Sequence, residues 1–101
     1  MASRLELHDK LKKVLGSDKV YYQPPANVKM DYPAIRYQRI DVHMTHADNI
    51  PYHTMNCYQI TVIDRYPDNP VINKLLTWPY CSYDRPYVAD NLNHDVLTLF
   101  F

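Results

Sequence analysis

Three of the five histidines, His43, His46 and His53, lie close together in the chain beside Asp41 and Asp48. Imidazole nitrogens and carboxylates bind zinc in proteins, so this segment is the first place to look for chemistry. His43 and His46 are three residues apart, but no second close pair follows them, and the spacing matches none of the strong metal motifs. The favoured interpretation is a solvated polar loop. A small metal-dependent enzyme built on residues 43–53 is the unfavoured alternative.

Other patterns of catalytic residues are missing from the sequence. The chain contains one glycine, which rules out a glycine-rich phosphate loop, and it has no GxSxG or HExxH motif. Cys57 alternates with strand residues and is interpreted as a core residue rather than a nucleophile. Cys57 and Cys81 form no CxxC motif, and two cysteines do not indicate a disulfide scaffold, so a reduced compartment is expected. We therefore expect a protein without enzymatic activity, cofactor or metal.

Length and charge limit the function classes further. A chain of 101 residues supports one domain, 1–101, and its hydrophobic fraction of 47% is ordinary for a folded protein. The net charge is zero with neutral histidines, which disfavours a general nucleic-acid binder, although DNA could still slide past a neutral wall. No apolar run approaches the length of a membrane span, and the first residues lack the layout of a signal peptide. Synthesis in the cytoplasm, use without export and no membrane partner are the expectations.

The first structural element is predicted to be a helix. Ser3 is a suitable N-cap, and Glu6 three residues later completes a capping-box pattern. Gly16 is placed to end the helix in a left-handed conformation. Between them lies one apolar stripe at helical spacing, consisting of Leu7, Leu11, Val14 and Leu15.

A hairpin is predicted in the middle of the chain. Residues 20–23 read as a short extended piece that leads into a stiff loop at Pro24-Pro25. Residues 34–42 carry strand signals, but the apolar side chains change face before Ile40, which indicates a bulge or a strand covered on both sides. Residues 55–64 form the clearest strand. Residues 43–53 between the two strands read as a loop or hairpin tip.

The second half predicts a short helix followed by two strands. Asn69 is the expected N-cap, with Pro70 in the first turn and Pro79 after the end of the helix. Pro86 places the strand 81–88 at a sheet edge or makes it irregular, because proline cannot donate to a ladder. Residues 89–91 form a turn before the last strand, 92–101. The predicted class is α+β, with an antiparallel or mixed sheet, an N-terminal helix and a second helix packed on the sheet, in the order α-β-β-α-β-β.

The aromatic content favours protein–protein contact. Ten tyrosines are many for this length, and tyrosine is enriched at interfaces, although aromatic residues also favour strands. The apolar residues 96–101 need a cover, either the chain's own core or a neighbouring subunit. Leu97 and Leu99 suit the core at least as well as an interface, whereas Phe100 and Phe101 are better interface candidates. Arg36 and Arg39 could pair with carboxylates across an interface, or could be solvated with little energetic effect.

Two stretches of sequence resemble a known family. Residues 21–35, YYQPPANVKMDYPAI, and residues 79–94, PYCSYDRPYVADNLNH, look like small proteins encoded among the head–tail joining genes of long-tailed bacteriophages. With YQITVID at residues 58–64 between them, the likeness covers most of the chain. The order of elements is also similar to that of tail terminators.

The resemblance implies a structural virion protein of the phage neck. Such proteins form a ring, commonly a hexamer, that ends tail-tube growth and joins the tail to the head. The implied partners are copies of the chain, the major tail-tube protein and a head connector or stopper, with DNA passing through the lumen without specific binding. A head-side connector or stopper is the alternative role. The hairpin from His43 to Tyr52 is expected to face the lumen or the tube. The interface candidates are Arg36, Arg39, His43, His46, Asp48, Tyr52, Phe100 and Phe101.

Overall fold

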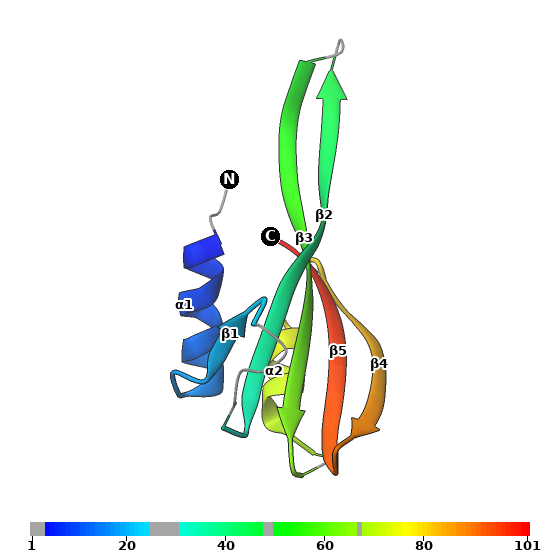
Figure 1. The fold of residues 1–101 in the computed structure, drawn as a ribbon. Helices are drawn as coiled ribbons and strands as arrows, with labels where there is room; N and C mark the ends of the chain where they lie inside the picture. Colours follow the sequence, from blue (N-terminus) through cyan, green and yellow to red (C-terminus); the bar gives the residue numbers. More distant parts are fainter. Residues whose placement is uncertain (1–3, 25–30, 48–49, 67) are drawn as a thin grey trace.

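The computed structural model describes residues 4–24, 31–47, 50–66 and 68–101, with the side chains of residues 41–55 left aside. Two helices and five strands follow in chain order: α1 (Arg4–Leu15), β1 (Val20–Tyr22), β2 (Ala34–Ala47), β3 (Ile50–Asp64), α2 (Pro70–Leu76), β4 (Cys81–Ala89) and β5 (Leu92–Phe100). The strands form one mixed sheet in the order β1-β2-β3-β5-β4, as Figure 1 shows. β1 runs parallel to β2, and the other neighbours are antiparallel. The predicted α+β class is confirmed.

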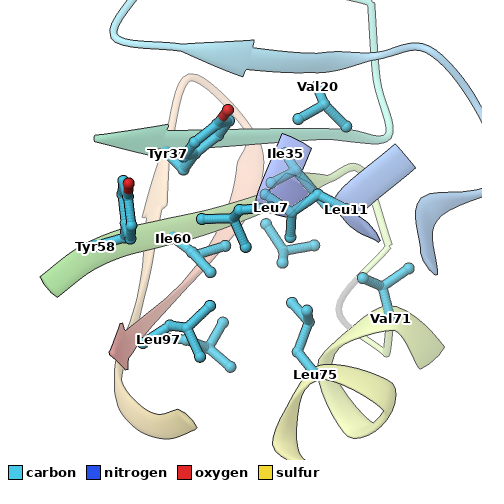
Figure 2. Close-up of a cluster of buried hydrophobic side chains, with 12 residues drawn as sticks. Leu7, Leu11, Val20, Ile35, Tyr37, Tyr58, Ile60, Val71, Leu75 and Leu97 are labelled. Atoms are coloured by element: carbon cyan, nitrogen blue, oxygen red, sulfur yellow. The ribbon is translucent and has the colours of Figure 1, made fainter. Parts of the chain in front are cut away.

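Both helices cover the same face of the sheet. Leu7 and Leu11 of α1 and Val71 and Leu75 of α2 are buried in one cluster with the apolar side chains of that face (Figure 2). The helical spacing of the stripe in α1 explains this burial, because it brings Leu7 and Leu11 to the same side. The sheet contributes alternate residues of its strands to the cluster: Val20, Ile35, Tyr37, Tyr58, Ile60, Val62, Leu97 and Leu99.

The helix ends follow local chemistry. Gly16 has φ of 78°, and its N–H donates to the carbonyl of Lys12 at 2.8 Å, so the left-handed C-cap is confirmed. The Asn69 side chain accepts from the Val71 N–H at 2.9 Å, so Asn69 is the N-cap of α2 as predicted. Ser3, the predicted N-cap of α1, lies outside the described residues.

The predicted bulge, turn and edge strand of the sheet are also confirmed. The register of β2 against β3 shifts between Arg39 and Asp41, which places a bulge at Ile40, where the apolar pattern changes face. Asp90 and Asn91 connect β4 to β5 with φ of 53° and 61°, the left-handed pair of a type I′ hairpin turn. β4 lies at the edge of the sheet, in agreement with the position of Pro86.

Two expectations need correction. Residues 20–22 are a strand of the sheet, so the order of elements gains a strand after α1. Three residues are too few to display alternation, which is why the sequence showed only an extended piece. The described part of residues 43–53 is paired strand and not loop, because β2 continues to Ala47 and β3 begins at Ile50; the other interpretation, the tip of a hairpin, agrees with the pairing of these two strands. Backbone hydrogen bonds hold this part of the hairpin together. Apolar and polar side chains need to alternate along a strand only where one of its faces is buried, so paired strands can lack that pattern.

Candidate assembly surfaces

The most prominent surface feature is a two-stranded arm, which we define as residues 42–47 and 50–55. β2 and β3 remain paired from Val42 and Asn56 to Ala47 and Ile50. β1 pairs only with residues 35–37, and β5 pairs with β3 only from Cys57 onward, so no described strand flanks the arm. Figure 1 shows the arm extending beyond the rest of the sheet, and the longest extent of the molecule is 51 Å against 27 and 23 Å across it.

The predicted interface residues divide between the arm and the body of the sheet. The backbones of His43, His46 and Tyr52 belong to the arm, and their side chains lie outside the described part of the structure. Asp48 lies outside the described residues altogether. The same limit applies to His43, His46 and His53 as the metal ligands of the unfavoured alternative. Among the described residues, no three histidine, cysteine or acidic side chains gather where a metal could bind.

The two predicted arginines do not form one patch. Arg36 pairs with Thr61 and Arg39 with Tyr58 in the β2–β3 ladder, and both arginine side chains are exposed. Since successive strand residues alternate in face, positions three apart point to opposite sides of the sheet. Arg39 therefore lies on the helix-bearing face, and Arg36 lies on the other. A single partner surface would reach both only by wrapping around the β2 side of the sheet.

Residues 97–101 divide between core and surface. Leu97 and Leu99 are buried in the chain's own core, which confirms the interpretation of these two as core residues. Phe100 and Phe101 are half-buried, so neither is enclosed by the chain itself. The backbone of Phe101 pairs with Asn56, with N···O distances of 2.9 and 3.3 Å, and this pairing fixes the end of β5 beside the base of the arm.

A pocket of about 310 Å³ lies between α1, the α2–β4 connection and the end of β5. Its apolar wall includes Trp78, Pro79 and Phe101, and Lys10 and Lys13 contribute from α1. The Lys10 ammonium lies 5.3 Å from the centre of the Phe101 ring and 5.9 Å from that of Trp78, within cation–π range. An apolar cavity with positive charge beside it suits an aromatic side chain accompanied by carboxylates. The sequence predicted Phe101 as an interface residue, but it gave no signal that Trp78 and α1 would line a pocket with it.

The exposed edge of the sheet carries further aromatic side chains. Tyr83 donates to the Asp95 carboxylate at 2.7 Å, and Tyr87 stacks on His94 with ring centres 4.5 Å apart. The hydrogen bond to Asp95 is the main cause that raises the pKa of Tyr83. These contacts fix both rings while leaving them partly exposed, and ordered tyrosines lose little entropy when a partner covers them.

One polar cluster lies under α1. The Tyr37 hydroxyl is 2.8 Å from Nδ1 of His8, and Arg4 donates to the same hydroxyl at 3.3 Å. Burial disfavours the charged form of both side chains. It is the main cause of the raised pKa of Tyr37 and of the lowered pKa of His8. The Tyr37 side chain is fully buried, so the cluster joins α1 to the sheet and does not line an open cleft. Its chemistry is structural.

The cysteines and the helices show no further site. Cys57 is buried, Cys81 is half-buried, and no disulfide joins them in the described part of the chain. Burial raises the pKa of the Cys81 thiol, which keeps it in the poorly nucleophilic protonated form. No helix among the described residues is long and apolar enough to cross a membrane.

Comparison with known proteins gives no assignment, since the chain matches no protein-family model and no curated protein significantly.

Proposed function

We infer that the chain is a structural virion protein that forms a ring at the head-proximal end of a phage tail. In this role it ends the growth of the tail tube and joins the tail to the head connector. Its partners are other copies of the chain, commonly six in such rings, the major tail-tube protein and a connector or stopper protein. DNA passes through the lumen without specific binding, which the zero net charge favours.

The observation that carries this proposal is the arm. An isolated two-stranded hairpin is marginally stable in water, because it has no third strand and no packing layer. The arm has no flanking strand in the described part of the chain, and its outer edges are therefore open to pairing. A neighbouring subunit or the rim of a tail tube would supply the missing surface. Such an element is expected in a protein whose work is to join other chains.

Exposed apolar side chains outside the arm support the same interpretation. Tyr66, Tyr80 and Val88 are strongly exposed, and Phe100 and Phe101 are half-buried. Apolar groups of this size gain free energy when a partner removes them from water, by about 25 cal/mol per Å². The resemblance of residues 21–35 and 79–94 to phage neck proteins points to the same class. It supports a head-side connector or stopper equally, and the position of the protein relative to the portal in a virion map would decide between the two.

Shortening the arm tests the proposal. Val42 and Asn56 are partners in the ladder, so residues 43–55 can be replaced by an Asn-Gly turn that keeps the register. The expected product is a folded body that no longer caps tail tubes in electron micrographs, whereas the wild-type chain yields capped tubes of uniform length. The matched control changes the turn at the other end of the sheet, Asp90→Asn with Asn91→Gly, and should cap normally. A wild-type chain that never associates with tail or connector proteins would overturn the proposal.

A further inference from the structure

The pocket beside Phe101 has the chemistry of a receptor for an acidic aromatic loop. Trp78, Pro79 and Phe101 give it apolar walls, while Lys10 and Lys13 provide positive charge from α1. Its volume of about 310 Å³ is at the lower end of the range for ligand pockets, and it can hold a tyrosyl side chain. Carboxylates that flank such a ring would lie close to the two ammonium groups.

The same chain displays a loop of that description. Tyr66, between β3 and α2, is 75% exposed, the largest exposure among the large apolar side chains of the described residues. Asp64 and Asp68 lie two residues before and two residues after it, and the exposed Arg65 lies beside it, so the two carboxylates and one guanidinium give residues 64–68 a net charge of −1. The Asp64 carboxylate accepts from the Tyr66 N–H at 3.2 Å and from the Asn69 side chain at 2.8 Å, so the base of the loop is held in place. An exposed aromatic residue between two carboxylates complements a lysine-rimmed aromatic pocket in polarity and in net charge.

The pocket and the loop lie at opposite ends of the sheet. Cys57 pairs with Phe100 at the pocket end, and Asp64 pairs with Asn93 at the loop end. Seven residue steps of β3 separate these pairs, or roughly 24 Å at about 3.4 Å per step. Figure 1 accordingly shows the β3–α2 connection at the end of the sheet away from the C terminus. A chain therefore cannot fill its own pocket, whereas a second copy can.

We propose that the Tyr66 loop of one copy inserts into the Lys10–Phe101 pocket of the next copy, in a head-to-tail contact. The inference rests on the proposed ring-forming function and names an interface for it. A head-to-tail contact joins two different surfaces, so it leaves one free pocket and one free loop on every oligomer until the ring closes. Self-complementary contacts between identical patches would not leave such free ends.

Zero-length crosslinking detects the contact even when association is weak. Equal amounts of ¹⁵N-labelled and unlabelled full chain are treated with a carbodiimide, which joins amines to carboxylates that touch. The expected products are mixed-isotope peptides that link Lys10 or Lys13 to Asp64 or Asp68. A chain that stays monomeric up to millimolar concentration and yields no such peptide refutes the inference.

Two surface variants test the direction of the contact. Tyr66→Ala removes the loop's aromatic group and keeps the pocket, while the double variant Lys10→Glu with Lys13→Glu reverses the pocket charge and keeps the loop. Loss of a central aromatic anchor should weaken self-association by at least roughly 30-fold. Tyr66→Phe keeps the ring and should associate as the wild type does. Val88→Ala removes another strongly exposed apolar side chain and should have no effect.

Mixing the two defective variants gives the decisive result. One retains only a working pocket and the other only a working loop, so together they should form a 1:1 dimer in native mass spectrometry and grow no further. A mixture that stays monomeric while the wild type assembles overturns the inference, as does a Tyr66→Ala chain that assembles normally. If Tyr66→Ala still caps tail tubes, the proposed function survives without this interface. If the wild type self-associates through the loop but never binds tail proteins, the interface survives and the proposed function fails.

Discussion

Replacing Tyr37 by Phe separates the two ways in which this residue joins α1 to the sheet. The Tyr37 ring packs against the rings of Tyr22 and Tyr58, with centres 4.9 and 6.0 Å away, and its hydroxyl contacts His8 and Arg4. Arg4 donates to the hydroxyl oxygen, and the tautomer of His8 decides whether Nδ1 accepts the hydroxyl proton or donates its own. Tyr37→Phe removes both hydrogen bonds and keeps the ring.

The expected cost is about 1 kcal/mol of unfolding free energy. Hydrogen bonds contribute roughly 0.5–1.5 kcal/mol each, but His8 and Arg4 are only half-buried, and water can replace the lost hydroxyl at both. Tyr37→Ala removes the fully buried ring as well and should cost about 3–5 kcal/mol. With a urea m-value of about 1–3 kcal/mol per M, Tyr37→Phe should lower the unfolding midpoint by roughly 0.3–1 M.

A double-mutant cycle with His8→Ala measures the hydroxyl contact itself. If the hydroxyl acts through His8, Tyr37→Phe should cost less in the His8→Ala background than in the wild type. Equal costs in the two backgrounds would show that the hydroxyl–imidazole contact contributes nothing. A Tyr37→Phe chain as unstable as Tyr37→Ala would refute the assignment of most of the energy to the ring.

Three further predictions concern pH and the helix ends. Burial, together with Lys12 and Arg4, lowers the pKa of His8, so below about pH 6.5 the unfolded chain binds this proton more readily than the folded chain does. Unfolding free energy should therefore fall as the pH drops below that value, and His8→Gln should reduce the slope in urea titrations at several pH values. Asn69→Ala removes the cap of α2 and should cost about 1 kcal/mol in thermal unfolding, whereas Asn69→Ser, which keeps a capping oxygen, should cost less. Gly16→Ala places a methyl group at φ of 78° and should cost roughly 1–2 kcal/mol, although no atom beyond the adjacent residues lies within 4 Å of the new Cβ, and Gly16→Asn should cost less.

The parts of the fold that depend on local sequence signals could be predicted from the sequence. The stripe containing Leu7 and Leu11 defined α1, and Asn69-Pro70 defined the start of α2. Pro86 indicated an edge strand because proline cannot donate to a ladder, and the change of apolar face before Ile40 indicated a bulge because side chains alternate in face along a pleated strand. Each of these signals can be recognised within a few consecutive residues.

The parts that depend on distant contacts could not be predicted. β1 is a strand because residues 20–22 pair with residues 35–37. The three residues themselves carry no pattern that predicts this pairing. The pocket combines α1 with Trp78 and Phe101, three places far apart in the sequence. The separation of Arg36 from Arg39, by contrast, could have been predicted, because strand residues three apart point to opposite faces of the sheet. The loop expected at residues 43–53 was wrong for another reason, because their polar side chains show no alternation although backbone pairing holds the described ones in two strands.

The bulge at Ile40 connects the sequence pattern to the proposed assembly role. A bulge puts two residues opposite one on the partner strand, which bends the strand and increases its twist. This one stands where the body of the sheet ends, since β1 pairs only as far as Tyr37 and β5 reaches β3 only from Cys57. Figure 1 shows β2 and β3 twisting across each other at this place before the arm continues. The half-exposed Ile40 side chain adds nothing to the core. The effect of the extra residue is therefore on the backbone, where the bulge sets the direction of the arm relative to the body of the sheet. An arm that is aimed in this way can meet a neighbour at a fixed angle, and a fixed angle between neighbours is the condition for a head-to-tail chain of subunits to close into a ring.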